Sequence, residues 1–166
     1  MFELKPLSKQ AIPKALEKAE RYRLLNEPVE AESICRDVLR MDPDNQSALI
    51  MLLLALTDQL EEGIADTVPQ AHEVLSHLRG DYERAYYAGI ICERRAKAQL
   101  TRGGPGSGYA SYATFREAME WYEKAEALRP PGNDDALLRW NTCVRILERQ
   151  PHVRPAPDER SEPPLE

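Results

Sequence analysis

The sequence has few cysteines, no long apolar run and no excess of basic charge, and each absence excludes a class of protein. Three cysteines in 166 residues form no Cys-x-x-Cys pair, and an odd number is a poor basis for a disulfide framework. We therefore expect a reduced, cytoplasmic compartment. The longest apolar run, residues 48–56, has nine residues, whereas a membrane span needs about 20. The N-terminus lacks the apolar segment of a signal peptide.

Charge and composition indicate a folded, acidic protein. Twenty-eight acidic residues against 22 basic ones give a net charge of −6, which argues against a dedicated nucleic-acid binder. Apolar residues make up 42% of the chain, enough for a hydrophobic core in a chain of this length. Arginine outnumbers lysine 16 to 6, which we interpret as a hint of a GC-rich bacterial genome.

Apolar residues recur at helical spacing along most of the chain, which predicts seven helices and no strand. Asn26 is expected to cap the second helix. The one glycine-rich segment, residues 102–113, is predicted to be a loop, and Thr114 and Glu117 a capping box at the start of the sixth helix. The predicted helices cover residues 10–25, 27–41, 46–60, 67–79, 82–101, 114–128 and 134–149.

Three regions follow from this pattern. Residues 1–9 form an N-terminal lead-in, and residues 10–149 form one helical domain. Residues 150–166 contain five of the 13 prolines and no apolar periodicity, which predicts a disordered, proline-rich tail.

The same residue types recur at the same steps in two distant segments. The two sets, at steps of 4, 7 and 12, are Ala31, Cys35, Val38 and Pro43, and Ala118, Tyr122, Ala125 and Pro130. This spacing resembles the second helix of a tetratricopeptide repeat (TPR). Ala19 and Tyr22 occupy the positions of the Gly-x-x-Tyr motif in the first helix of that repeat. The chain is therefore similar to bacterial TPR proteins over residues 10–149, although the middle unit departs from the pattern.

The resemblance implies an all-α solenoid of about three helical hairpins and a C-terminal capping helix. Small residues are expected where two helices of a hairpin cross, Ala19 opposite Ala31 and Gly89 opposite Ala118. Trp140 is too large for such a position, so the last helix is expected to be the cap. The alternative is an ordinary bundle of amphipathic helices.

In such solenoids the first helix of each hairpin lines a concave surface that binds partner proteins. We expect a groove with an apolar centre and a charged rim, suited to a peptide segment of another protein. The expected partner-binding residues are Leu16, Glu20, Arg23, Ile50, Leu54, Tyr86, Ile90, Glu93 and Arg94. The Lys and Asn clamp of TPR adaptors that bind chaperone tails is absent from these positions. The alternative is that residues 101–113 or the last helix fill the groove.

No set of residues points to catalysis, a cofactor or a metal. His72 and His77 are five residues apart, whereas helical metal-binding pairs are three or four apart. The glycine-rich segment lacks the Gly-Lys-Ser/Thr ending of a phosphate loop. We therefore expect a non-catalytic adaptor or assembly factor that binds no nucleic acid and no membrane. The alternative is a structural subunit that self-associates, so that a homo-oligomer is possible, or that belongs to a larger complex.

Overall fold

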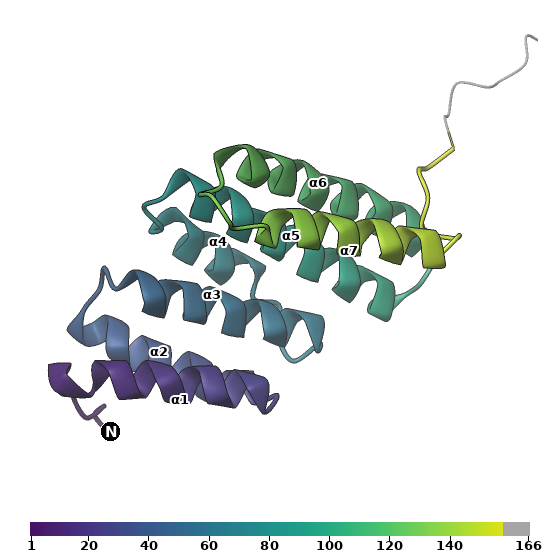
Figure 1. Ribbon diagram of the computed structural model, residues 1–166. Coiled ribbons are helices and arrows are strands. Elements are labelled where there is room, and N and C mark those ends of the chain that lie inside the picture. Colours follow the sequence, from purple (N-terminus) through teal and green to yellow (C-terminus); the bar gives the residue numbers. More distant parts are fainter. Residues whose placement is uncertain (158–166) are drawn as a thin grey trace, which may run out of the picture.

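The computed structural model describes residues 1–157, and within them all regular secondary structure is helical. A single 3-10 turn, Lys9–Ala11, leads into the first α-helix. The α-helices are α1 (Ile12–Leu24), α2 (Pro28–Met41), α3 (Gln46–Glu61), α4 (Val68–Ser76), α5 (Asp81–Arg102), α6 (Ser107–Leu128) and α7 (Asp135–Arg149) (Figure 1). The prediction of an all-helical chain is confirmed.

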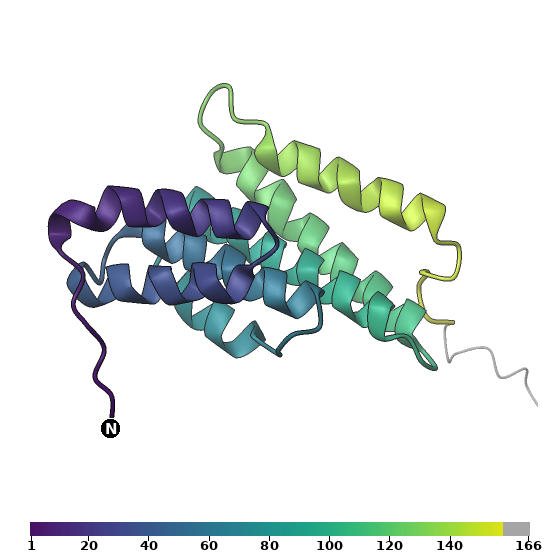
Figure 2. The ribbon, with the colours of Figure 1, turned by 90° about the horizontal axis from the view of Figure 1, so that it is seen from below.

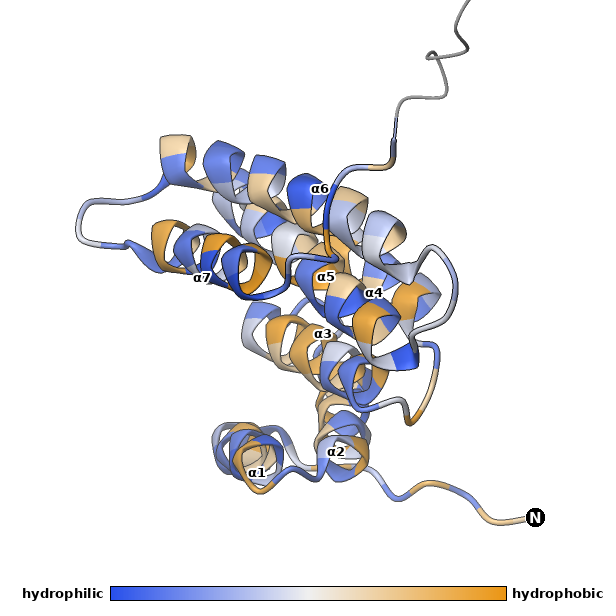
Figure 3. Ribbon diagram, turned by 90° about the vertical axis from the view of Figure 1, so that its right-hand side faces the viewer, coloured by the Kyte–Doolittle hydropathy of each residue, from blue (hydrophilic) through white to orange (hydrophobic). Residues whose placement is uncertain are grey.

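The helices form a stack in which each one packs against the next in the chain. Alternate helices also touch, since α1 packs against α3 and α3 packs against α5. Figures 2 and 3 show α1 and α7 projecting toward the same side of the stack, with α3 and α5 between them. The odd-numbered helices therefore share one side of the molecule.

The end of α1 differs from the prediction in one detail. Asn26 has a φ of 63°, a left-handed conformation that asparagine tolerates better than most residues. The amide of Glu27 donates to the carbonyl of Tyr22 at 2.8 Å, and the amide of Asn26 donates to that of Arg23 at 3.0 Å. These two bonds form a Schellman motif. Asn26 therefore ends α1 and does not cap α2.

The start of α3 follows from short-range contacts. The side chain of Asn45 accepts a hydrogen bond from the amide of Ala48 at 2.9 Å, which caps the helix. Nine residues of α3 are buried, because α1, α2, α4 and α5 all pack against it. This central position explains why the longest apolar run of the chain lies in this helix.

The predicted start of α6 is wrong by seven residues, since the helix begins at Ser107 and only residues 103–106 connect it to α5. Thr114 lies inside the helix and donates to the carbonyl of Ala110 at 3.0 Å. The buried hydroxyl of Ser111 donates to the carbonyl of Ala96 in α5 at 3.0 Å. Packing against α5 thus makes the first turns of α6 helical, and they are not part of a glycine-rich loop.

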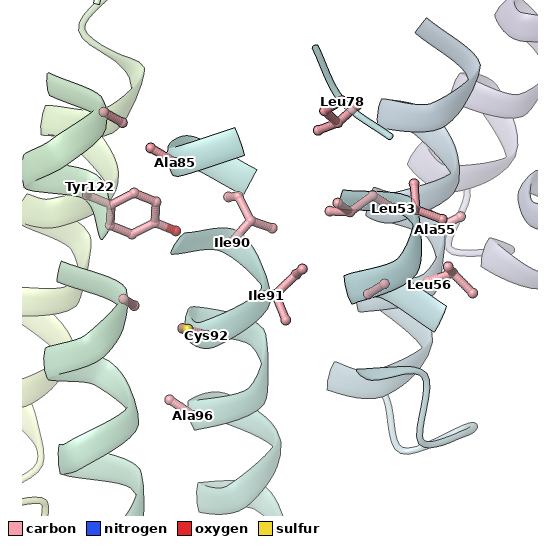
Figure 4. Close-up of a cluster of buried hydrophobic side chains, with 14 of the residues drawn as sticks. Leu53, Ala55, Leu56, Leu78, Ala85, Ile90, Ile91, Cys92, Ala96 and Tyr122 are labelled. Atoms are coloured by element: carbon pink, nitrogen blue, oxygen red, sulfur yellow. The ribbon is translucent and has the colours of Figure 1, made fainter. Parts of the chain in front are cut away.

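The hydrophobic core extends through the stack from α1 to α7. In the close-up of Figure 4, Ile91 of α5 faces Leu56 of α3, whereas Cys92 and Ala96 of α5 face α6. The helix α5 is therefore buried on two sides. All three cysteines are free and buried, as expected for residues that act as small apolar side chains.

Small residues allow close approach within two of the helix pairs. Ala19 of α1 and Ala31 of α2 are both fully buried. A Cβ atom on Gly89 of α5 would lie 2.5 Å from Cε1 of Tyr122 in α6. Tyr122 therefore fills the space beside Gly89. The residue expected at this place, Ala118, lies one helical turn earlier in α6.

The first residues of the segment predicted to be a disordered tail pack against the helical domain. Val153 is buried and belongs to the hydrophobic core. The carbonyl oxygen of His152 approaches Gly108 so closely that a Cβ atom on this residue would clash with it. The chain after α7 therefore packs against the start of α6 as far as Val153, because the side chain of Val153 is buried there and removed from water. Residues 158–166, the rest of the predicted tail, lie outside the described residues.

Candidate partner-binding face

The side of the stack formed by α1, α3, α5 and α7, called here the odd-helix face, carries a chain of ion pairs. Arg23 of α1 donates from Nε to Oδ2 of Asp58 in α3 at 2.7 Å, and from Nη2 to Oδ1 at 3.3 Å. Arg94 of α5 donates from Nη1 to Oδ1 of Asp58 at 2.9 Å and also bonds Glu61. Asp58 therefore joins three helices through two guanidinium groups, in geometry that favours strong charge-assisted bonds.

A second cluster on the same face centres on Glu93, whose side chain is 0% exposed. Arg139 of α7 donates to Oε2 of Glu93 at 3.1 Å, and Lys97 lies 3.4 Å from the same oxygen. The thiol of Cys143 donates to Oε1 at 3.5 Å. Burial, reinforced by the carboxylate of Glu93, raises the pKa of Cys143 to about 12, so the thiol keeps its proton. These contacts attach α7 to α5.

Tyrosines form a third feature, near the start of α5. The rings of Tyr82 and Tyr86 stack at 5.8 Å, and Tyr87 meets Tyr86 edge-on at 5.0 Å. Tyr86 also lies 5.9 Å from Tyr122 in α6. Burial raises the pKa of Tyr86. Tyr86 is thus both a partly exposed surface residue and a support for the core.

Two hollows lie on the odd-helix face, the first among the ion pairs of Asp58 and the second beside Arg139. The first has a volume of about 260 Å³ and is lined by Arg23, Leu24, Asn26, Asp58, Glu61, Glu62 and Arg94. The second has a volume of about 360 Å³ and is lined by Tyr86, Asp135, Leu138, Arg139 and Thr142. Leu24 and Leu138 are 80% and 59% exposed, so each hollow has an apolar side chain at its edge.

Seven of the nine predicted site residues are at least partly exposed. Glu20 is exposed, and Leu16, Ile50, Leu54 and Tyr86 are half-buried. Arg23 and Arg94 are half-buried, and both form salt bridges with Asp58. These two arginines are therefore part of the ion-pair chain and do not form a free rim.

Two of the predicted site residues are inaccessible. Ile90 and Glu93 are both 0% exposed, so no partner can touch them without a rearrangement. Ile90 packs into the core, and Arg139 and Cys143 of α7 cover Glu93. The apolar centre expected for the groove therefore loses Ile90 and exposes less apolar surface than the sequence predicted.

Several residues of the face were not among the nine expected partner-binding residues. Asp58, Glu61 and Arg139 form the ion pairs, and Leu24 and Leu138 line the hollows. Helical spacing indicates that Asp58 shares a face with the predicted Leu54, because it lies one helical turn further along α3. No local signal marks Arg139, because its partner is 46 residues away in the sequence.

The three buried cysteines are the remaining nucleophilic side chains of interest. Burial raises the pKa of Cys35 and of Cys92 to about 12, as it does for Cys143. These thiols are therefore protonated at neutral pH and are poor nucleophiles. Within residues 1–157, no three His, Cys, Asp or Glu side chains are placed to hold a metal ion.

Comparison of the chain with protein-family models, with curated proteins and with solved structures yields no match. No helix in the described part of the chain has both the length and the apolar character needed to cross a bilayer. Inference about function therefore rests on the geometry of the molecule.

Proposed function

We propose that the chain is a short TPR-like solenoid of three hairpins and a capping helix, and that it acts as a non-catalytic adaptor or assembly factor. The contact of α1 with α3 and of α3 with α5 supports the repeat, because equivalent helices of successive hairpins touch in a solenoid. The buried small residues Ala19, Ala31 and Gly89 support it further. The three free cysteines are compatible with the proposed cytoplasmic location.

The observation that carries the proposed function is the pair of hollows on the odd-helix face, each with an exposed leucine. Leu24 and Leu138 are large apolar side chains that the fold does not bury. The polar groups that line the first hollow beside Leu24 are already paired with each other. Apolar anchor sites around a polar region suit an extended or helical segment of another protein.

The charges of the face define the chemistry of that segment. The basic groups Arg23, Arg94, Lys97 and Arg139 are all held in ion pairs. Three acidic side chains of the face have no salt bridge in the part of the chain that the structure describes, namely Glu20, Glu62 and Asp135. The carboxylates that remain free favour a partner segment with apolar anchors and with lysine or arginine beside them.

The test compares two matched truncations on the full chain. After a partner has been captured from the native cell and purified, we expect Leu138→Ala to weaken its binding at least about tenfold, since a well-packed anchor is worth about 1.4 kcal/mol or more. Ile64→Ala is the control, because Ile64 is also exposed but lies outside both hollows. Equal dissociation constants for the two variants, measured by calorimetry, would contradict the proposed face.

A further inference from the structure

An apolar pocket lies away from the odd-helix face. It has a volume of about 640 Å³ and is formed by the end of α4, the start of α5 and the end of α6. Its walls are mostly apolar and include Leu75, Ala85, Trp121 and Leu128. It shares no lining residue with the two hollows of the odd-helix face. The size falls within the range of about 300–1,000 Å³ that ligand pockets occupy.

The first seven residues of the chain, called here the N-terminal arm, contain an unusual amount of exposed apolar surface. Met1, Phe2 and Leu4 are all exposed and lie outside any helix. Pro6 favours extended backbone for the residue before it, so the arm does not prolong α1 backward. In an extended segment Phe2 and Leu4 point to the same side, and Glu3 points to the other.

We propose that the N-terminal arm of one copy of the chain docks in this pocket of a second copy, with Phe2 and Leu4 inside it. This goes beyond the proposed adaptor function, because it uses a different surface. The arm and the pocket supply matching apolar surfaces that each molecule leaves exposed. Exchange of two arms between two copies closes the assembly as a dimer.

The charges that line the pocket are compatible with the N-terminal arm as its occupant. The ammonium of Lys124 lies 4.4 Å from the centre of the Trp121 ring, and no carboxylate within residues 1–157 forms a salt bridge with it. The one acidic residue of the pocket, Asp81, is already bonded to Arg84. The side chain of Lys124 is exposed and flexible, so it is available at the pocket rim to pair with Glu3, which stays outside the pocket when Phe2 and Leu4 enter it.

The occupant comes from a second copy because the arm of the same chain lies elsewhere. None of the residues that line the pocket belongs to the arm. Figures 1 and 3 show the arm beside α1 and α2, with α3 between it and the helices of the pocket. The arm and the pocket thus lie on different parts of the molecule, so they can meet between two copies but not within one.

The test measures association of the full chain by analytical ultracentrifugation over a wide concentration range. We expect the wild-type chain to form a dimer, and Phe2→Ala with Leu4→Ala to raise the dissociation constant at least about tenfold. Ala127→Glu should do the same, because it adds a carboxylate to the pocket lining that competes for Lys124. The matched controls are Leu25→Ala, another exposed leucine, and Ala113→Glu, which adds the same charge to α6 outside the pocket.

A mixture of the two variant proteins gives the sharper result. The arm variant retains an intact pocket, and Ala127→Glu retains an intact arm, so a mixed dimer has one wild-type contact and one contact damaged on both sides. Because a contact that one substitution has already broken loses little more from the second, the mixture should associate more tightly than either variant alone. A wild-type chain that stays monomeric at every concentration would overturn the proposal, as would a dimer that neither variant weakens. Either failure is separate from failure of the proposed function, which is measured with Leu138→Ala on the opposite surface.

Discussion

Removal of Arg139 should destabilise the protein more than removal of the charge of Glu93, although the two residues form one ion pair. The side chain of Glu93 is 0% exposed, whereas those of Arg139 and Lys97 are 32% and 24% exposed. The carboxylate therefore depends on protein groups for its stabilisation. The two cations reach water along their flexible apolar stems.

The magnitudes follow from that asymmetry. In Arg139→Leu, Glu93 keeps only Lys97 at 3.4 Å and the thiol of Cys143 at 3.5 Å. Breaking a buried pair costs about 3–5 kcal/mol, and partial exposure of Arg139 places the expected loss near the lower end, about 3 kcal/mol. In Glu93→Gln, the amide oxygen still accepts a hydrogen bond, so the loss is that of the charge, about 1–2 kcal/mol.

Urea unfolding followed by circular dichroism measures these free energies. The double variant should be less destabilised than the sum of the two single variants, with a coupling of about 1–3 kcal/mol, as for groups in direct contact. Arg129→Leu is the control, because its pair with Glu126 is more than one third exposed on both sides and should cost less than about 1 kcal/mol. A larger loss for Glu93→Gln than for Arg139→Leu would refute the reasoning.

Three further predictions concern packing, connections and the thiols. Gly89→Ala should lower the free energy of unfolding by about 1–3 kcal/mol despite the better helix propensity of alanine, because the new Cβ meets Tyr122 at 2.5 Å; Ala110→Leu, at an exposed position of α6, should not. Trypsin should cut after Arg102, next to the short connector, before it cuts at Arg36 or Arg145 inside helices, and mass spectrometry of the first fragments checks the order. Burial raises the pKa of all three thiols from 9.0 to about 12. The free energy that the protonated thiols contribute to folding is therefore fully present below pH 9 and is lost as the pH rises toward 12. Urea titrations across that window should show the decline, with a shallower slope for Cys35→Ala.

Sequence predicted the helices best where short-range contacts fix their ends. The start of α3 at Gln46 was predicted correctly, because Asn45 caps it locally. The start of α6 was not, because the bond of Ser111 to Ala96 joins residues 15 positions apart in two helices. Anchoring of Val153 in the core was missed for the same reason. A local pattern does not contain contacts that form only after the chain has folded back.

The candidate site shows the same division. Helical spacing placed Arg23, Tyr86 and Arg94 on one side of the molecule, and the structure does bring Arg23 and Arg94 to the same carboxylate. Spacing alone assigned Glu93 to that surface as well. It could not reveal that α7 returns across α5 and covers this residue. Whether a helical stripe faces solvent or another helix depends on distant segments, so it has to come from the fold.

The two proposed surfaces differ in chemistry, and salt should therefore separate them. Partner binding on the odd-helix face depends on the free carboxylates Glu20, Glu62 and Asp135, and raising the salt from about 0.1 to 1 M shortens the Debye length from about 10 to 3 Å. That change should slow association with a basic partner segment. Docking of the N-terminal arm buries Phe2 and Leu4 and uses one ion pair, so its affinity should change much less. Stopped-flow association rates for the partner, measured beside sedimentation of the chain alone, test this contrast. An equal loss in both measurements would mean that the two processes do not use separate surfaces.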